Sequence, residues 1–149
     1  MTKITDTTEV AKYVREQLKK EFPAYKFSVT SKYFPGGSEL NVALMAGPVE
    51  VFADNLVYYG DGETMVDNDQ NTQLNPYTIA NEYTNGICNG RKLTPEAWAV
   101  LHRVAEIAQE NNWDNSDSQS DYFDVNYYFH LDIGKWNKDY QRTAQWQNE

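Results

Sequence analysis

The sequence has 149 residues, of which 40% are apolar and 14% aromatic, and a formal net charge of −9. A chain of this length can bury roughly 68–70% of its unfolded surface as a single domain, so we expect one domain over residues 1–149. One cysteine, no run of about 18 apolar residues and no apolar signal sequence exclude a disulfide scaffold and a membrane span, and favour the cytoplasm.

The charge is segregated along the chain. Residues 1–32 hold seven basic and four acidic side chains, whereas residues 33–90 hold eight acidic side chains and no Lys or Arg. Residues 91–149 hold six basic and ten acidic side chains. The middle segment should make one face of the fold strongly negative, which would repel nucleic acid and attract a basic protein surface.

The first third predicts a helix followed by a β-hairpin. Asp6 and Glu9 have the spacing of a capping box, and apolar residues then recur every four positions until Pro23, which predicts a helix over 7–22. Alternating apolar residues on both sides of a Gly-rich turn predict two antiparallel strands in a hairpin over 25–45.

The middle third is less regular. Val49, Phe52, Leu56 and Tyr59 fall on one helical stripe, which predicts a short helix over 49–59. Residues 61–76 are polar and acidic and predict a loop, and residues 77–85 fit another short helix. Asn-Gly pairs at 85–86 and 89–90 predict turns.

The last third predicts the second main helix and a strand. Thr94 and Pro95 form a helix start, and the apolar stripe that follows predicts a helix over 94–111. Strict alternation predicts a strand over 122–133, followed by a polar tail over 135–149. The predicted fold class is α+β, with an antiparallel sheet (hairpin 25–45 plus strand 122–133) packed against helices 7–22 and 94–111.

The acidic segment is the first candidate site. Closely spaced carboxylates can imitate a row of phosphates and occupy a basic groove, although net charge can also serve solubility alone. The candidate partner-binding residues are Glu39, Glu50, Asp54, Asp61, Glu63, Asp67 and Asp69, together with Glu82.

The basic first third is an alternative site for nucleic acid. Its cations could contact phosphates, but they are interleaved with acidic residues, and a sequence pI of 4.6 favours a solvated helix face. The candidate nucleic-acid-binding residues are Lys12, Arg15, Lys19, Lys20, Lys26 and Lys32.

The polar face of the last predicted strand is a third candidate, for acid–base catalysis. Alternate residues project together, and His130 with Asp124 or Asp132 could act as acid and base. A half-buried sheet that shows polar residues to water explains Asn126 and Tyr128 equally well. We therefore expect no enzyme, with His130 as the one alternative.

Metal and nucleophile chemistry fit the sequence poorly. Residues 67–71 open like a calcium loop, but Thr72 stands where the loop needs Gly and Thr78 where it needs Glu. Zinc would need more ligands than His102, His130 and Cys88 offer, and Cys88 has no nucleophile signature around it. We expect no metal and no cofactor.

Several short motifs in the first third resemble one protein family, the large polyvalent protein-associated domain, type twenty-nine. The similarity covers about residues 6–58, and residues 113–128 are similar to C-terminal extensions of such proteins. The matching segments are Val14-Arg15, Leu18-Lys19, Phe22-Pro23, Lys26-Phe27-Ser28-Val29, Gly36-Gly37-Ser38, Asn41-Val42 and Gly47-Pro48.

This resemblance implies an origin in a phage or a conjugative element, and it brings no catalytic residues. We therefore expect an accessory protein that binds a host protein, such as a defence or nucleic-acid-handling enzyme, and inhibits it through the acidic surface. Nucleic acid is the less favoured partner, and no membrane contact is expected.

Overall fold

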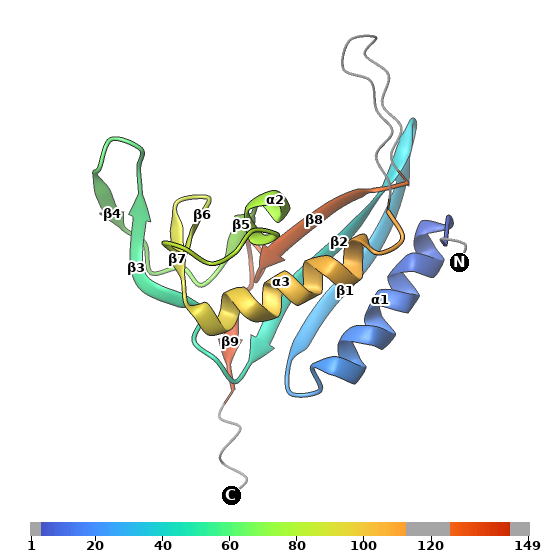
Figure 1. The fold of residues 1–149 in the computed structure, drawn as a ribbon, viewed down its shortest axis with the longest axis horizontal. Coiled ribbons are helices and arrows are strands. Elements are labelled where there is room, and N and C mark those ends of the chain that lie inside the picture. The colour runs from blue at the N-terminus through green and yellow to red at the C-terminus, as the bar shows by residue number, and fades with distance from the viewer. Residues whose placement is uncertain (1–3, 113–125, 144–149) are drawn as a thin grey trace, which may run out of the picture.

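The computed structural model describes residues 4–112 and 126–143. It confirms an α+β fold in which two main helices pack on a sheet (Figure 1). The helices of this part of the chain are α1 (Thr7–Glu21), α2 (Pro76–Ile79) and α3 (Pro95–Gln109). No described helix is long and apolar enough to cross a membrane.

The strands form two sheets. Sheet A has the order β1-β2-β8-β5, with β9 also paired to β2, and sheet B has the order β4-β3-β7-β6. The strands of sheet A are β1 (Lys26–Phe34), β2 (Gly37–Gly47), β5 (Thr72–Leu74), β8 (Tyr128–Ile133) and β9 (Gln141–Arg142). The strands of sheet B are β3 (Phe52–Tyr58), β4 (Thr64–Val66), β6 (Ile87–Cys88) and β7 (Arg91–Leu93).

Both main helices begin as their sequences predict. The Asp6 carboxylate caps α1 by accepting a hydrogen bond from the Thr8 backbone N–H at 3.0 Å. Thr94 caps α3 through the Ala97 N–H at 3.2 Å, and Pro95 takes the first turn, where it needs no donor.

Sheet A is mixed, which corrects the antiparallel sheet that the sequence predicts. The hairpin of β1 and β2 is antiparallel, but β8 runs parallel to β2, with Leu40 opposite Phe129 and Val42 opposite Leu131. A short turn forces antiparallel pairing, whereas the long connection before β8 permits either direction. Of the strand predicted over 122–133, residues 128–133 form β8, and 122–125 lie outside the described residues.

The strands of the middle third correct two further predictions. The helix predicted over 49–59 is wrong, because residues 52–58 form β3, which pairs with β4 and β7. The loop predicted over 61–76 contains β4 and β5, two strands of three residues each. Both corrections come from distant pairing partners, which a local apolar pattern does not reveal.

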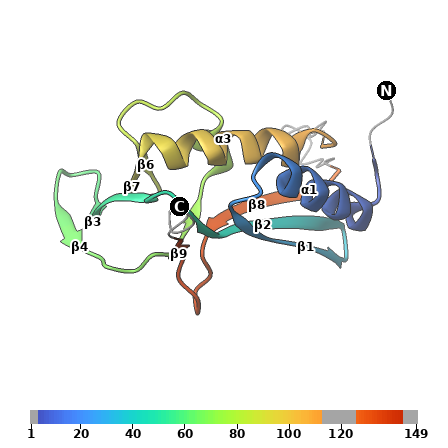
Figure 2. The ribbon, with the colours of Figure 1, turned by 90° about the horizontal axis from the view of Figure 1, so that it is seen from below.

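The core lies between sheet A and the two main helices. Figure 2 shows α1 and α3 side by side on one face of the sheet. Leu18 of α1 and Leu101 of α3 are fully buried, as are Leu40, Val42 and Leu44 of β2. In the described part of the chain no helix covers the opposite face of sheet A, here called its open face (Figure 2).

The polar tail predicted from residue 135 is partly built into the fold. Tyr140 is buried, and its hydroxyl donates a hydrogen bond to the Val49 carbonyl at 2.7 Å. Residues 141–142 form β9 beside the end of β2, and Trp136 is almost fully exposed. Residues 144–149, including Trp146, lie outside the described residues.

Candidate functional site

The candidate site is the hairpin of β3 and β4 with the loop that follows it, residues 52–69, here called the acidic arm. Figure 1 shows it extending away from α1 and α3. The hairpin turns at 59–63, where the Tyr59 N–H donates to the Glu63 carbonyl at 2.9 Å and Gly62 adopts a φ of +90°. A residue with a side chain rarely adopts that φ, so Gly62 suits the turn.

Large apolar side chains are exposed on the acidic arm. Met65 is 62% exposed and Val66 is 71% exposed, and Tyr59 at the turn is also exposed. Met65 pairs with Val57 and Val66 pairs with Leu56, so adjacent residues of β4 project to opposite faces of the hairpin. Both faces of the arm therefore present apolar surface that residues 4–112 and 126–143 do not bury.

Five of the seven predicted partner-binding acids lie on the same arm: Asp54, Asp61, Glu63, Asp67 and Asp69. Two of them order the local backbone: Asp61 accepts from the Glu63 N–H at 3.0 Å, and Asp67 accepts from the Asp69 N–H at 2.9 Å. Asp54 accepts hydrogen bonds from the Tyr58 hydroxyl and from the Leu56 N–H, and the bond to Asp54 raises the pKa of Tyr58. The carboxylates of Asp54, Asp61 and Asp67 are thus held by hydrogen bonds within the arm.

Arg91 of β7 anchors the arm, and the sequence reasoning missed it. Its side chain is 2% exposed and lies over the Phe52 ring, with 4.0 Å between the guanidinium carbon and the ring centroid. Its Nη1 atom lies 3.3 Å from the Asp67 carboxylate and donates to the Asp69 carbonyl at 3.0 Å. Nothing local marks this residue for burial, because the contact depends on the pairing of β7 with β3.

The remaining two predicted acids lie elsewhere. Glu39 is on β2 in sheet A, with its Oε1 atom 3.7 Å from the His130 Nε2 atom. Glu50 precedes β3 and lies 3.8 Å from the Arg142 guanidinium. Glu39 and Glu50 therefore each lie beside a basic neighbour of their own, His130 and Arg142, and not among the carboxylates of the arm.

The predicted nucleic-acid-binding cations lie on α1 and β1. Lys12, Arg15, Lys19 and Lys20 are exposed on the helix, and Lys26 and Lys32 lie on the strand. Arg15, Lys19 and Lys26 line one groove of 450 Å³ between α1 and β1. The Arg15 guanidinium already has an intramolecular partner, because its Nη2 atom donates to the Val29 carbonyl at 2.8 Å. Arg15 thereby covers part of the sheet edge at β1.

The predicted acid–base row on the last strand is only partly assembled. His130 and Asp132 share the open face of β8, and Asp124 lies outside the described residues. Asn126 serves the fold, since its amide donates to the Ile4 and Asn111 carbonyls at 2.8 and 2.7 Å. Among the described residues, His130 lies within 3.7 Å of Glu39 on β2 and forms no ion pair with Asp132 of its own strand.

Metal and thiol chemistry find no assembled site in the described residues. Across 4–112 and 126–143, no three His, Cys, Asp or Glu side chains are grouped to hold a metal ion. Asp67 of the calcium-like segment turns to Arg91. Cys88 is buried, its sulfur accepts from the Asn75 N–H at 3.3 Å, and burial raises the pKa of its thiol.

The comparisons with known proteins place the chain in a family. The model of large polyvalent protein associated domain 29 matches residues 5–112, a longer stretch than the 6–58 that the motifs indicate. No curated protein and no solved structure matches the chain. The chain therefore belongs to the large polyvalent protein associated domain 29 family, a domain typical of the polyvalent proteins of phages and other mobile elements.

Proposed function

We propose that this chain is an accessory protein of a phage or another mobile element, and that it binds a host protein in the host cytoplasm through its acidic arm. The observation that carries the proposal is the exposure of Met65 and Val66 on an arm that also holds five carboxylates. Aromatic side chains and Met are enriched at interface cores, and charged groups set the rim and the choice of partner.

The charge of the arm indicates the class of partner. Asp61, Glu63 and Asp69 are exposed, and the cation that reaches this loop, Arg91, is buried beneath it. Such a surface is complementary to a basic groove, which is the feature that proteins use to hold nucleic acid. A host defence or nucleic-acid-handling enzyme fits this description, and an occupied groove would leave that enzyme inhibited.

The apolar part of the proposal is tested by affinity capture from host lysate with mass spectrometry. The wild-type chain should retain a defence or nucleic-acid-handling protein, and the double variant Met65→Ala/Val66→Ala should lose it. Tyr77→Ala is the matched control, because Tyr77 is 77% exposed on α2, outside the arm. A wild-type chain that retains no such protein contradicts the proposal.

The electrostatic part is tested on the purified complex. Replacing Asp61, Glu63 and Asp69 by their amides should slow association and weaken its dependence on salt. Asp67 is left intact because it pairs with Arg91. The control neutralises three exposed acids on α1 and α3, namely Glu9, Glu16 and Glu96, and should leave the rate within about twofold, since charges beyond a Debye length are screened.

Nucleic-acid binding is a second candidate, because Arg15, Lys19 and Lys26 converge on one groove. A gel shift at low salt, with Lys19→Ala/Lys26→Ala as the variant, decides it, and an absence of binding to single- or double-stranded DNA and RNA ends this alternative. Catalysis is the least supported role, and a His130→Ala variant should keep full biological activity.

A further inference from the structure

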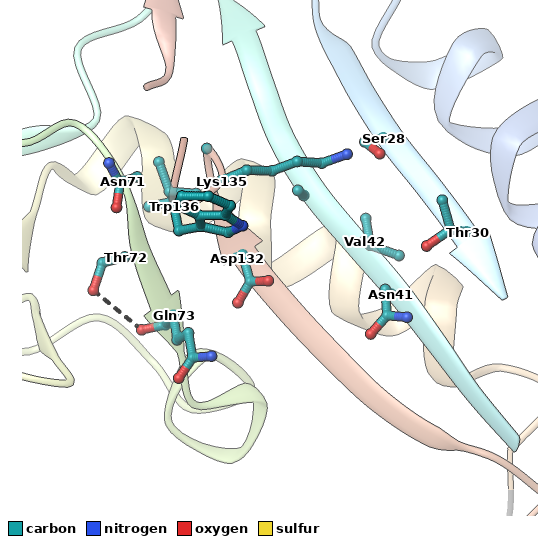
Figure 3. A pocket seen from close by; sticks show the side chains of 13 residues that line it. Ser28, Thr30, Asn41, Val42, Asn71, Thr72, Gln73, Asp132, Lys135 and Trp136 are labelled. Carbon is teal, nitrogen blue, oxygen red and sulfur yellow. Dashed lines mark hydrogen bonds between the residues drawn. The ribbon is translucent and has the colours of Figure 1, made fainter. Parts of the chain in front are cut away.

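The open face of sheet A holds a cavity of 420 Å³ that the acidic arm does not line (Figure 3). One row of paired residues runs across its floor: Ser28 on β1, Ala43 on β2, Asp132 on β8 and Gln73 on β5. Ala43 has the smallest side chain of the row and lies between Ser28 and Asp132. The row therefore forms a depression between polar side chains on both sides.

The turn after β8 builds one wall of the cavity. Gly134 has a φ of +64°, and a Cβ atom there would lie 2.9 Å from Asn71 Cβ. Lys135 and Lys138 close the turn with two backbone hydrogen bonds of 2.7 and 2.9 Å. The Asn71 amide donates to the Asp139 carboxylate at 2.5 Å, so the turn is fixed against the segment that leads into β5.

Trp136 sits at the tip of this turn, lines the cavity, and is 90% exposed. The exposed indole of Trp136 is not on a free tail, because the turn that carries it is closed by backbone hydrogen bonds and is bonded to Asn71 through Asp139. Figure 3 shows Trp136 and Asp132 at the same end of the cavity, and the Lys135 side chain reaching across it towards Ser28. The turn therefore holds a flat aromatic surface beside a carboxylate.

Several polar groups that face the cavity have no partner within the described residues. The Asp132 carboxylate makes no hydrogen bond or ion pair there. Burial raises the pKa of this carboxyl group, and His130 lowers it by a smaller amount. The side chains of Ser28, Thr30 and Gln73 likewise form no hydrogen bond with a described side chain or backbone group. A half-buried carboxylate without a partner costs free energy, and a ligand with N–H donors would recover it.

We propose that this cavity binds a guanine base, stacked on Trp136 and held by Asp132. A carboxylate accepts two hydrogen bonds side by side, and guanine presents two adjacent donors, N1–H and the 2-amino group, on one edge. Aromatic side chains stack on unpaired bases in this way.

The surroundings favour guanine over the other ligands that a Trp and a carboxylate can hold. Adenine offers an acceptor, N1, where the ionised carboxylate needs a donor. A small organic cation would leave most of the 420 Å³ unfilled, whereas nucleotide-sized ligands occupy cavities of roughly 300–1,000 Å³. Lys135 supplies a positive charge for a phosphate group.

Calorimetric titration of the full chain with GMP and with AMP tests the base. We expect saturable GMP binding and at least about tenfold weaker binding of AMP. Trp136→Ala and Asp132→Asn should each weaken GMP binding about tenfold, because stacking and charge-assisted hydrogen bonds each contribute on that scale. Tyr77→Ala changes an exposed aromatic that does not line the cavity; it is the control and should bind GMP as the wild type does.

Further ligands in the same titration distinguish a free guanine nucleotide from guanine within a nucleic-acid strand. The difference in affinity between GMP and guanosine measures how much the phosphate group contributes. Two single-stranded RNA octamers, one rich in guanine and one rich in adenine, distinguish a free nucleotide from a strand. Binding of the guanine octamer alone assigns the cavity to a strand and upholds the guanine site. Equal affinity for GMP and AMP, no binding of any guanine ligand, or wild-type affinity in both variants overturns the proposal.

The pH dependence gives an independent readout. The ionised carboxylate accepts both guanine donors, so GMP affinity should fall as the pH drops through the raised pKa of Asp132, and Asp132→Asn should remove that dependence. The acidic arm takes no part in the cavity, so this test and the capture of a host protein succeed or fail separately.

Discussion

Strand β2 at the centre of sheet A and strand β4 at the edge of sheet B differ in whether their apolar residues are buried. In sheet A, β2 is covered by α1 and α3, and Leu40, Val42 and Leu44 are completely buried. In sheet B, the edge strand β4 has three exposed residues, although two of them are the apolar Met65 and Val66. Burial of apolar surface stabilises β2, whereas the apolar surface of β4 remains available to another molecule.

This difference indicates that the residues that stabilise the fold and the residues proposed to bind a partner lie in different places. The acidic arm is held at its root by Arg91 and by the pairing of β3 with β7, and its outer half adds little packing. Substitutions in the core of sheet A should therefore change the free energy of unfolding, and substitutions at the tip of the arm should change binding alone. The following changes test that separation, in order of decreasing effect on stability.

The largest effect is expected at Leu101, which is fully buried in α3. Leu101→Ala removes three carbon atoms from the core and leaves a cavity, so the free energy of unfolding should fall by about 2–5 kcal/mol. Urea denaturation followed by circular dichroism measures it. A loss below about 1 kcal/mol would mean that the layer of α3 over sheet A is less tightly packed than the burial of Leu101 indicates.

The next effect is expected at the root of the arm. Arg91→Ala removes the contact with Phe52, the ion pair with Asp67 and the hydrogen bond to Asp69, and should cost about 2 kcal/mol. Arg91→Lys is the conservative control and should cost less, because two guanidinium nitrogens, Nε and Nη2, have no hydrogen-bond partner in the described part of the chain.

Amide hydrogen exchange locates the effect of Arg91→Ala. Exchange should accelerate over residues 67–71 and stay slow in α3, because Arg91 holds the loop rather than the core. Unchanged exchange over 67–71 would show that the loop is held by its own turns, and that Arg91 contributes only to the packing of sheet B.

A smaller effect, with a defined pH dependence, is expected at Asp132. Burial raises its pKa from 3.8, so the folded state holds the proton more tightly than the unfolded state does. The ionised carboxylate therefore destabilises the fold above that raised pKa, and the penalty vanishes below the unfolded value. Asp132→Asn should raise the melting temperature at pH 7 and leave it unchanged at pH 3, whereas Asp61→Asn, on an exposed turn, should leave it unchanged at both.

The parts of the fold that local patterns encode could be predicted. The caps at Asp6 and Thr94, and the apolar spacing behind them, indicate α1 and α3 to within two residues at either end. The Gly-rich turn at 36–37 indicates the hairpin of β1 and β2, because a short connection leaves one way to pair. In these elements the residues that predict the structure are the same few residues that form it.

The rest depends on partners far away in the chain. Phe52 and Leu56 fit a helical stripe as well as a strand, and only β4 and β7 decide in favour of β3. Burial of Arg91 and the position of Trp136 depend on such contacts too, so the root of the arm and the wall of the cavity could not be predicted. The acidic residues of the arm could be predicted as a group, because charge segregation is visible in the sequence itself.

The smallest effect on stability is expected where the effect on binding is largest. Met65→Ala/Val66→Ala removes side chains that are already 62% and 71% exposed, so little buried area is lost and the free energy of unfolding should change by less than about 0.5 kcal/mol per residue. Capture of the host protein should nevertheless fail, because truncated anchors at the centre of an interface cost far more than rim contacts.

Each half of that expectation can fail on its own. Loss of stability comparable to that of Leu101→Ala would mean that the tip of the arm packs against the body in solution, and the contrast between the two sheets would collapse. Stable variants that still capture the partner would move the interface to other surfaces, with the basic groove of Arg15, Lys19 and Lys26 next in order. Stable variants that lose the partner would show that the exposed side chains of β4 contribute to binding of the host protein and not to the stability of the fold.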